Sequence, residues 1–169
     1  MKASRRLLKV TQSALKTFGT VYETFEMDIH PANLLDLNAL RHVESVCFPK
    51  DAWPLLDLVA VLTFPGVVRL KGVEAGQMIA FIAGDPRPGE GFSWIATLGV
   101  LPAYRGLGYG RALLEACERL LPTRRIRLSV RSSNEEAIRM YKNAGYFAID
   151  RWGRYYNDGE DALVMEKTR

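Results

Sequence analysis

The chain has 169 residues, of which 48% are hydrophobic, and a formal net charge of +4 at pH 7. These values are typical of one globular domain with a sizeable core, and they exclude fibrous and disordered classes of protein. No apolar run is long enough to span a membrane. Cys47 and Cys117 lie in apolar helical contexts, which is typical of buried thiols in a reducing compartment, so we expect a cytoplasmic protein. The two histidines have no suitably spaced cysteines, so no metal site is expected.

The positive charge is concentrated at the N-terminal end. The first 22 residues contain no acid and five basic residues: Lys2, Arg5, Arg6, Lys9 and Lys16. The rest of the chain therefore has a formal charge of −1, which does not indicate a nucleic-acid surface. We predict a basic N-terminal extension over residues 1–24, followed by one domain over residues 25–169. Apolar residues recur at helical spacing from Leu7 to Tyr22. They fit a targeting peptide, a membrane-surface helix, or an additional helix or strand that packs on the domain or is partly disordered; we adopt the last interpretation.

Hydrophobic periodicity and turn residues predict the remaining elements in chain order. Strands are expected at 25–29, 67–73, 77–83, 92–100, 126–130, 146–152 and 161–166. Helices are expected from Asn33 or Asp36 to Val46, at 55–62, from the end of a glycine-rich loop to 121, and from a capping box at Ser133 and Glu136 to Gly145. The order β-α-α-β-β-β-α-β-α-β-β predicts an α/β fold, with a mixed sheet of about seven strands and helices on both faces.

The most informative stretch is residues 95–114, where a strand-like run becomes a helix through a glycine-rich loop. This loop contains Arg105, Gly106, Gly108, Gly110 and Arg111. Glycines leave room for a ligand, and the free backbone amides and dipole of a helix N-terminus attract an anion such as pyrophosphate. The loop lacks the Lys-Ser/Thr pair of a Walker loop, and its glycine spacing differs from that of dinucleotide-binding folds.

The arrangement of strand, Leu-Pro, Tyr-Arg-Gly-x-Gly-x-Gly and helix resembles the acetyl-CoA loop of the GNAT acetyltransferase superfamily. The family motif Arg/Gln-x-x-Gly-x-Gly/Ala corresponds to Arg105-x-x-Gly108-x-Gly110. The resemblance covers about residues 25–167. It implies a GNAT fold, acetyl-CoA as the donor, no metal, and direct attack of an amine without a covalent enzyme intermediate. The cofactor-binding positions that it implies, largely through the backbone, are Leu98, Gly99, Val100, Arg105, Gly106, Leu107, Gly108, Tyr109, Gly110 and Arg111.

A second segment, from Arg131 to Tyr146, resembles a further motif of the same family. The resemblance implies that Asn134 contacts the cofactor and that Tyr141 lies near the sulfur as general acid. Taken from the residues alone, Asn134 is also suited to capping a helix, and Tyr141 to packing in the core from a helix face.

The segment Arg154 to Met165 resembles the Tyr-Tyr-x-Asp-Gly-Glu-Asp-Ala ending of protein N-terminal acetyltransferases, including RimI-like enzymes. The resemblance implies that Tyr155 and Tyr156 border a slot for a peptide N-terminus. Phe48-Pro49 and Trp53 resemble the loop that forms the other wall. The acceptor is therefore expected to be a protein or peptide N-terminus, and the enzyme a monomer or weak homodimer. A lysine side chain or small amine as acceptor, and an acyl-CoA-binding module without turnover, remain alternatives.

The general base is the point at which the sequence departs from the family. Many relatives have Glu or His at the position of Ser129, and some have Tyr at the position of Trp94. Serine does not act as a base near neutral pH. Two replacements are open: Asp51, in the loop after Phe48-Pro49, or a water held by Ser129 and backbone carbonyls. Glu160 is less favoured because it lies in a turn before a strand.

Overall fold

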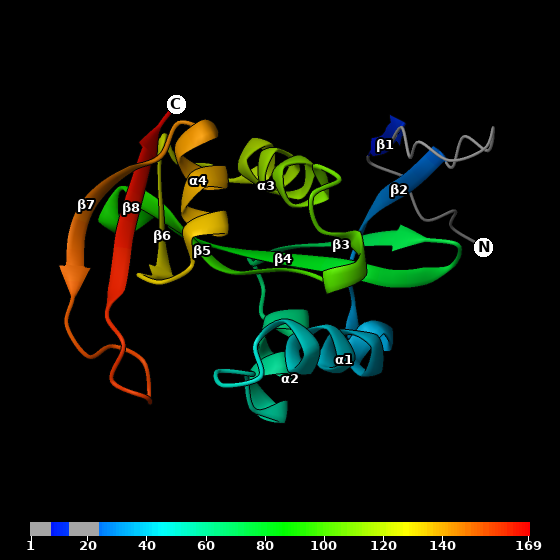
Figure 1. The fold of residues 1–169 in the computed structure, drawn as a ribbon, viewed down its shortest axis with the longest axis horizontal. Coiled ribbons are helices and arrows are strands. Elements are labelled where there is room, and N and C mark those ends of the chain that lie inside the picture. The colour runs from blue at the N-terminus through cyan, green and yellow to red at the C-terminus, as the bar shows by residue number, and fades with distance from the viewer. Residues whose placement is uncertain (1–7, 14–23) are drawn as a thin grey trace.

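The centre of the molecule is an eight-stranded mixed β-sheet. The computed structural model describes residues 8–13 and 24–169. Its strands are β1 (Leu8–Ser13), β2 (Thr24–Pro31), β3 (Val68–Glu74), β4 (Gln77–Arg87), β5 (Phe92–Val100), β6 (Arg125–Arg131), β7 (Phe147–Trp152) and β8 (Ala162–Thr168). They lie in the order β1-β2-β3-β4-β5-β6-β8-β7 (Figure 1). Every neighbouring pair is antiparallel except β5 and β6.

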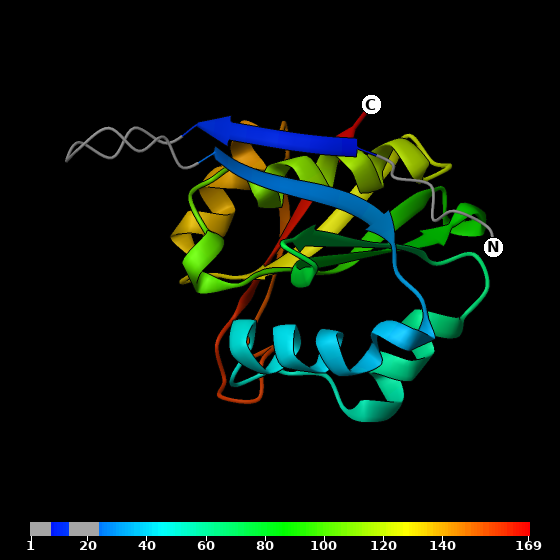
Figure 2. The same ribbon diagram turned by 90° about the vertical axis from the view of Figure 1, so that its right-hand side faces the viewer.

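Helices cover both faces of this sheet. The α-helices of the described residues are α1 (Leu37–Cys47), α2 (Leu55–Thr63), α3 (Tyr109–Leu120) and α4 (Glu135–Asn143). α1 and α2 lie on one face, and α3 and α4 lie on the other (Figures 1 and 2). The predicted order of strands and helices is therefore confirmed.

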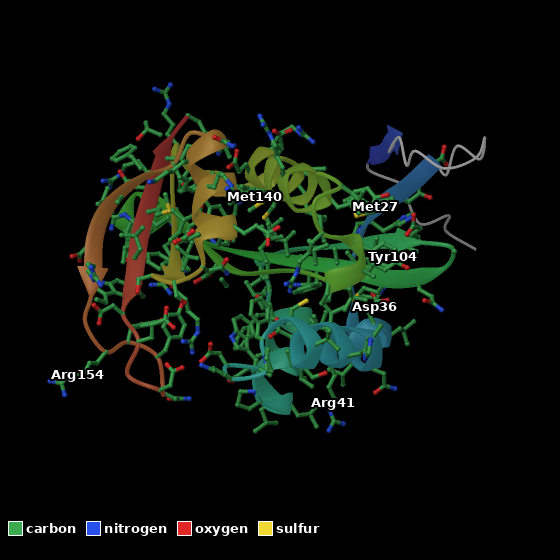
Figure 3. The ribbon with its side chains drawn as sticks, in the orientation of Figure 1. Met27, Asp36, Arg41, Tyr104, Met140 and Arg154 are labelled. Carbon is green, nitrogen blue, oxygen red and sulfur yellow. The ribbon has the colours of Figure 1, made fainter. Side chains whose placement is uncertain are left out.

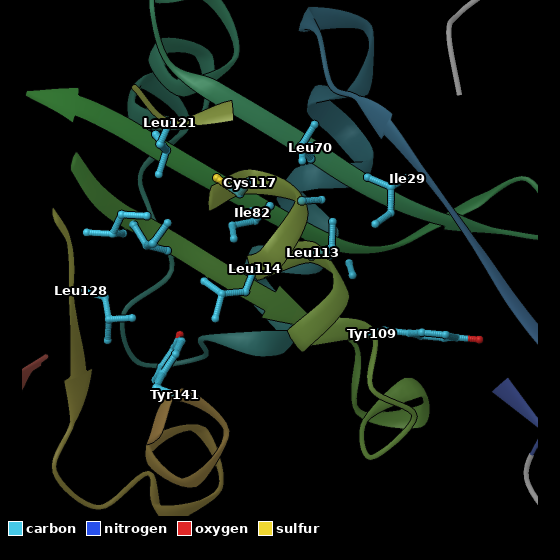
Figure 4. Packing of buried hydrophobic residues seen from close by; sticks show 14 of the residues in the cluster. Ile29, Leu70, Ile82, Tyr109, Leu113, Leu114, Cys117, Leu121, Leu128 and Tyr141 are labelled. Atoms are coloured by element: carbon cyan, nitrogen blue, oxygen red, sulfur yellow. The ribbon is translucent and has the colours of Figure 1, made fainter. Parts of the chain in front are cut away.

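Two hydrophobic cores join the helices to the sheet. On one face, Leu113, Leu114 and Cys117 of α3 are fully buried against the strands (Figure 4). On the other face, α1 and α2 bury Leu40 and Leu62 in a separate cluster. Burial of apolar surface is the main stabilising term in folding, at about 25 cal/mol per Å². The sheet is thus held rigidly from both sides over β3, β4 and β5.

The N-terminal extension contributes β1. Residues Leu8–Ser13 pair antiparallel with β2, from Leu8 opposite Ile29 to Ser13 opposite Thr24. This part of the extension is therefore an added strand, the interpretation we adopted. Leu7 and the residues from Ala14 to Tyr22 that show helical spacing lie outside the described residues.

The functional site depends on the way β5 and β6 separate. They pair only from Phe92 opposite Arg125 to Ile95 opposite Leu128. Beyond this point β5 continues alongside β4, as far as Val100 opposite Ala80, and no pair with β6 follows. The carboxyl-terminal half of β5 therefore borders a wedge-shaped opening in the sheet, here called the β5–β6 gap.

Three local predictions are corrected. The loop expected at 84–91 is mostly strand, because β4 runs to Arg87 and pairs with the start of β5. The expected capping box at Ser133 does not form; Asn134 caps α4, and its Oδ1 accepts from the amide of Ala137 at 3.1 Å. The helix expected to run to residue 121 ends at Leu120, which is half exposed.

Candidate active site

The glycine-rich loop joins β5 to α3 at the open end of the β5–β6 gap. Gly106 and Gly108 have φ of 75° and 76°, a left-handed conformation that glycine adopts without steric cost. Gly108 is the N-cap of α3, and no side chain bonds to the first-turn amides of the helix. The first helical bond runs from the amide of Ala112 to Gly108. The preceding amides can therefore bind an anion together with the helix dipole.

Of the other loop residues, some pack against the core or a neighbouring helix, and others form hydrogen bonds or ion pairs that hold the loop in place. The side chain of Tyr109 is buried in the α3 core and points away from Tyr141 (Figure 4), so only its backbone can serve the loop. A Cβ at Gly110 would come within 3.2 Å of the sulfur of Met140, so this glycine allows α3 to approach α4 (Figure 3). Arg105 Nε donates to the carbonyl of Val100 at 3.0 Å and fixes the turn. Arg111 pairs with Glu115 at the helix surface.

A pocket of about 210 Å³ lies at the closed end of the gap. Its walls come from α1, the α1–α2 loop, β5, β6, α4 and the β7–β8 loop. The predicted site residues that it brings together are Phe48, Asp51, Trp53, Leu98, Ser129, Asn134, Tyr141, Tyr155 and Tyr156. Pro49, Gly99, Val100 and the glycine-rich loop lie outside its lining. A second cavity, of about 320 Å³ and lined by Glu26, Asp28 and residues 73–76, contains none of the predicted positions.

Tyr141 reaches the pocket from α4, on the α3–α4 face of the sheet. Its side chain is buried and packs edge-on against Tyr146, with ring centroids 5.8 Å apart. Burial raises the pKa of the Tyr141 hydroxyl, and the nearby phenol of Tyr156 adds to the effect. The hydroxyl is therefore protonated at neutral pH, which is the state that a proton donor requires.

Arg131, at the end of β6, ties together the two loops that border the pocket. Its Nε and Nη2 donate to the two carboxylate oxygens of Asp51 at 2.7 and 2.8 Å. Its Nη1 donates to Glu160 at 2.6 Å and to Asp158 at 3.0 Å, and its guanidinium stacks on the ring of Tyr156. We call this group of five residues the Arg131 cluster.

The Arg131 cluster bears on the choice of general base. Both oxygens of Asp51 already accept charge-assisted hydrogen bonds from Arg131, whose own pKa is raised mainly by these bonds. Each oxygen therefore already has a hydrogen-bond donor, so an incoming amine would have to compete with Arg131 for Asp51. The role of Asp51 as proton acceptor stays a prediction from the sequence.

Ser129 lines the pocket from β6, as expected from its place on the polar face of that strand. Trp94 does not line the pocket; its indole stacks on Trp152 of β7, with centroids 5.7 Å apart and planes 2° apart. Trp152 in turn contacts Tyr155, so a row of aromatic rings supports the tyrosine wall from the sheet. Neither Ser129 nor Trp94 supplies a basic group.

Sequence reasoning missed one acidic residue of the pocket. Glu44 of α1 lines it and is only 2% exposed. Its Oε1 accepts a hydrogen bond from Thr97 Oγ1 of β5 at 3.0 Å. A signal was present, because Glu44 continues the apolar stripe of α1, four residues after Leu40 and three before Cys47. An acid on a buried helix stripe is unusual unless it has a function or a partner.

Comparison with known proteins agrees with this geometry. Residues 37–146 match the model of the acetyltransferase (GNAT) family. The chain is 30% identical over 157 residues to the N-terminal acetyltransferase A complex catalytic subunit ard1 of Schizosaccharomyces pombe, covering 83% of this chain and 85% of the relative.

Solved structures extend the likeness to the whole fold. The Escherichia coli ribosomal-protein-S18-alanine N-acetyltransferase superposes with a TM-score of 0.74 at 26% identity, covering 84% of this chain and 93% of that one. Arabidopsis thaliana NAA60 in complex with acetyl-CoA gives a TM-score of 0.73 at 21% identity, covering 84% and 98%, and this shows the shared fold. The chain therefore belongs to the GNAT family of acetyltransferases, and it is related to the N-α-acetyltransferases within it.

Proposed function

We propose that this protein is an acetyl-CoA-dependent N-α-acetyltransferase that acts on protein or peptide N-termini. The observation that carries the proposal is the pocket between the α1–α2 and β7–β8 loops, which opens onto the β5–β6 gap. Relatives of the chain carry N-terminal acetyltransferase activity in their names, which supports the same acceptor.

The gap and the glycine-rich loop fit acetyl-CoA. The left-handed glycines and free α3 amides suit a diphosphate, and the unpaired edge of β5 suits an arm that contains amides. We expect the backbone of Leu98, Gly99 and Val100 to bind that arm, and Asn134 to contact the cofactor beside its cap of α4. Acetyl-CoA supplies an activated acetyl thioester; binding and proton transfer are left to the protein.

The acceptor is proposed to enter between the α1–α2 loop and the β7–β8 loop, on the other face of the sheet from the glycine-rich loop. Phe48 and Trp53 on one loop, and Tyr155 and Tyr156 on the other, give two walls of aromatic rings and tyrosine hydroxyls. Such walls can hold an extended chain end by its backbone. Tyr141, protonated and facing the pocket from the α4 side, is the proposed donor of a proton to the departing sulfur.

The proposal is tested by measuring thiol release from acetyl-CoA with short peptides that differ only in a free or blocked N-terminus. Turnover only with free N-termini is the expected result. Turnover of a lysine-containing peptide whose N-terminus is blocked would show that the acceptor is the lysine side chain, which is the second candidate. Tight acetyl-CoA binding without turnover of any amine would indicate the binding module instead.

Other expectations about partners stay predictions. None of the helices within residues 8–13 and 24–169 is both long and apolar enough to cross a membrane. We propose a peptide as the macromolecular partner rather than nucleic acid, because only the N-terminal extension is strongly basic. We also expect a cytoplasmic location and a monomeric or weakly dimeric state.

A further inference from the structure

We propose that Glu44 is the proton acceptor for the amine of the incoming acceptor, and thus the catalytic base that the family positions at Ser129 and Trp94 do not supply. The inference rests on the proposed function, because it assumes that an amine occupies the pocket. The positions of Glu44 and Tyr141 in the pocket support this assignment.

The β5–β6 gap passes through the sheet, so residues from both faces of the sheet line the pocket. Glu44 belongs to α1, which lies on the same face of the sheet as α2 (Figure 1), and the α1–α2 loop carries one of the proposed aromatic walls. Tyr141 belongs to α4, on the side of the glycine-rich loop. An amine that enters from the α1 side therefore meets a carboxylate, and a thiol that lies on the α4 side meets a phenol. This is the division of base and acid that acetyl transfer requires.

The position of Glu44 along the β5–β6 gap is also consistent with a role as proton acceptor. Its partner Thr97 is the second residue of β5 beyond the last pair with β6, so Glu44 lies where the gap begins to open. The hydrogen bond from Thr97 engages Oε1 and holds the carboxyl group against β5. A carboxylate fixed at this depth is suited to the reacting amine rather than to distant parts of either substrate.

Other candidates for the base are less suitable. Asp51 has both oxygens engaged by Arg131, and Asp158 and Glu160 belong to the same cluster. Ser129 has no basic group. Among the described residues that line the pocket, Glu44 and Asp51 are the only carboxylates, and Asp51 is the one that forms a salt bridge with Arg131.

The electrostatic surroundings favour a base that works near neutral pH. The titratable and charged groups that line the pocket with Glu44 are Asp51, Arg131, Tyr141, Tyr155 and Tyr156. On its own helix Glu44 interacts with Cys47, which also has Arg105 beside it. Burial raises the pKa of Glu44, and hydrogen bonds from Thr97 and the Trp53 backbone oppose this in part. A carboxyl group with a raised pKa is a better proton acceptor at neutral pH than an ordinary glutamate.

The reaction balances with the groups present. The ammonium of the acceptor gives one proton to the Glu44 carboxylate, which later releases it to solvent. The neutral amine then attacks the acetyl carbonyl, so that a C–N bond forms and the C–S bond breaks. The sulfur takes its proton from Tyr141, and the remaining surplus proton of the attacking nitrogen restores that phenol. The products are an N-acetyl amide, CoA with a free thiol, and one proton.

The test compares Glu44→Gln with the wild-type enzyme over pH 6.5 to 9.5. The amide keeps the shape and can still accept from Thr97, but it cannot take a proton. At pH 6.5 we expect kcat/KM to fall about a hundredfold or more. The deficit should shrink as the pH passes the pKa of a free α-amino group, about 8, since the acceptor then loses its proton unaided. Glu44→Asp, which keeps a carboxylate, should retain part of the activity at pH 6.5.

Glu118→Gln is the matched control. Glu118 is also a buried glutamate, 5% exposed, but it lies in α3 outside the pocket and bonds to Tyr146 and Lys167. Its variant should keep the wild-type pH dependence. A Glu44→Gln enzyme with the wild-type rate at pH 6.5, or, when the acceptor is a free α-amino group, with a deficit that is constant over pH, would overturn the assignment.

Thermal unfolding gives a second readout that does not depend on turnover. Because the folded-state pKa of Glu44 is raised, its ionised form lowers stability above the unfolded pKa, and stability improves as the pH falls. Glu44→Gln should therefore unfold at the same or a higher temperature than the wild type at pH 8, and the difference should vanish near pH 4. Lower stability at every pH would mean a purely structural glutamate.

The two proposals fail separately. If the wild-type enzyme acetylates a lysine side chain instead of an N-terminus, the N-α activity is wrong, and the Glu44 deficit should persist to higher pH because a lysine amine has a pKa near 10.4. If free N-termini react and Glu44→Gln behaves as wild type, only the base assignment fails. If no amine binds or reacts, both are rejected.

Discussion

Tyr141 and Tyr146 are buried in the same hydrophobic cluster, and their rings pack together, but their hydroxyls have different surroundings. The hydroxyl of Tyr146 donates to Glu118 at 2.8 Å, away from the pocket, whereas Tyr141 lines the pocket. Burial raises the pKa of both hydroxyls, so neither ionises near neutral pH. The two tyrosines therefore differ in the surroundings of the hydroxyl, and these surroundings are the reason why Tyr141 is the proposed proton donor.

Replacing Tyr141 by Phe should lower kcat by about 10²–10⁴-fold, because the departing thiolate loses its proton donor. Acetyl-CoA affinity should be nearly unchanged, which titration calorimetry can check. Tyr146→Phe is the matched control: it should keep its turnover but lose about 1–3 kcal/mol of stability, because buried Glu118 loses a donor. Equal turnover in the Tyr141 variant and the wild type would remove Tyr141 from the mechanism.

The glycine-rich loop offers a second test at single positions. Gly106 and Gly66 both have positive φ, 75° and 85°, and a Cβ at either would meet no atom within 4 Å. Alanine at each should therefore cost a similar amount of stability, about 1–2 kcal/mol, from the left-handed backbone alone. Only Gly106→Ala should also weaken CoA binding, measured by calorimetry. Equal affinities for both variants would argue against the loop as the diphosphate site.

At the scale of elements, the Arg131 cluster fastens the α1–α2 loop to the β7–β8 loop. Lys50 adds a second link, because its amine donates to Asp158 at 2.9 Å. The links join residues that are distant in sequence: Arg131 and Asp51 are 80 positions apart. The two walls of the proposed acceptor slot are thus held at a fixed separation by charge rather than by apolar packing.

Arg131→Gln should raise the KM for the peptide, by up to about a hundredfold, because both walls lose their common support. The affinity for acetyl-CoA should change little, since the glycine-rich loop is separate. Steady-state kinetics with varied peptide and with varied acetyl-CoA distinguish the two effects. A KM for acetyl-CoA that rises as much as that for the peptide would contradict a role confined to the walls.

The cluster also has a defined response to acid. Hydrogen bonds from Lys50 and then Arg131 lower the pKa of Asp158 to about 2, from an ordinary value of 3.8. Because the folded-state pKa is lowered, the stabilisation by Asp158 is present above about pH 4 and is lost as the pH falls towards 2. The walls should therefore stay fastened throughout the pH range of the kinetic tests.

The elements themselves were largely readable from the sequence, whereas the chemistry was readable only in part. Alternation in β6, the stripe of α3 and the glycine spacing are local signals, and they predicted strand, helix and loop correctly. The role of Asp51 depended on Arg131, and that of Glu44 on Thr97, 53 positions away. Local periodicity cannot report which distant side chains the sheet brings together, so the sequence alone left the choice of general base open.

On the scale of the whole molecule, the sheet consists of two antiparallel parts joined only by the short parallel pairing of β5 and β6. One part contains β1 to β5, and the other β6, β8 and β7. A ligand in the gap contacts both parts, so binding should couple to the stability of the entire fold.

We therefore expect CoA, at about a hundred times its dissociation constant, to raise the free energy of unfolding by about 2.7 kcal/mol. For a chain of this size the melting temperature should rise by roughly 5–10 °C. Differential scanning calorimetry measures this directly. Pantetheine, which lacks the diphosphate, should give a smaller rise at the same concentration, and no rise with CoA would contradict the proposed site.

The β5–β6 gap also determines where the sheet has an unpaired strand edge. An unpaired strand normally lies at the rim of a sheet, where it can recruit another chain and begin aggregation. Here the free edge of β5 lies inside the sheet, in a wedge that closes at Ile95 and Leu128. The last pair of β5 and β6 sets the inner limit of the gap, and it lies two residues before Thr97, the hydrogen-bond partner of Glu44. A ligand chain that entered along β5 would therefore end close to Glu44, which is where the proposed reaction needs it.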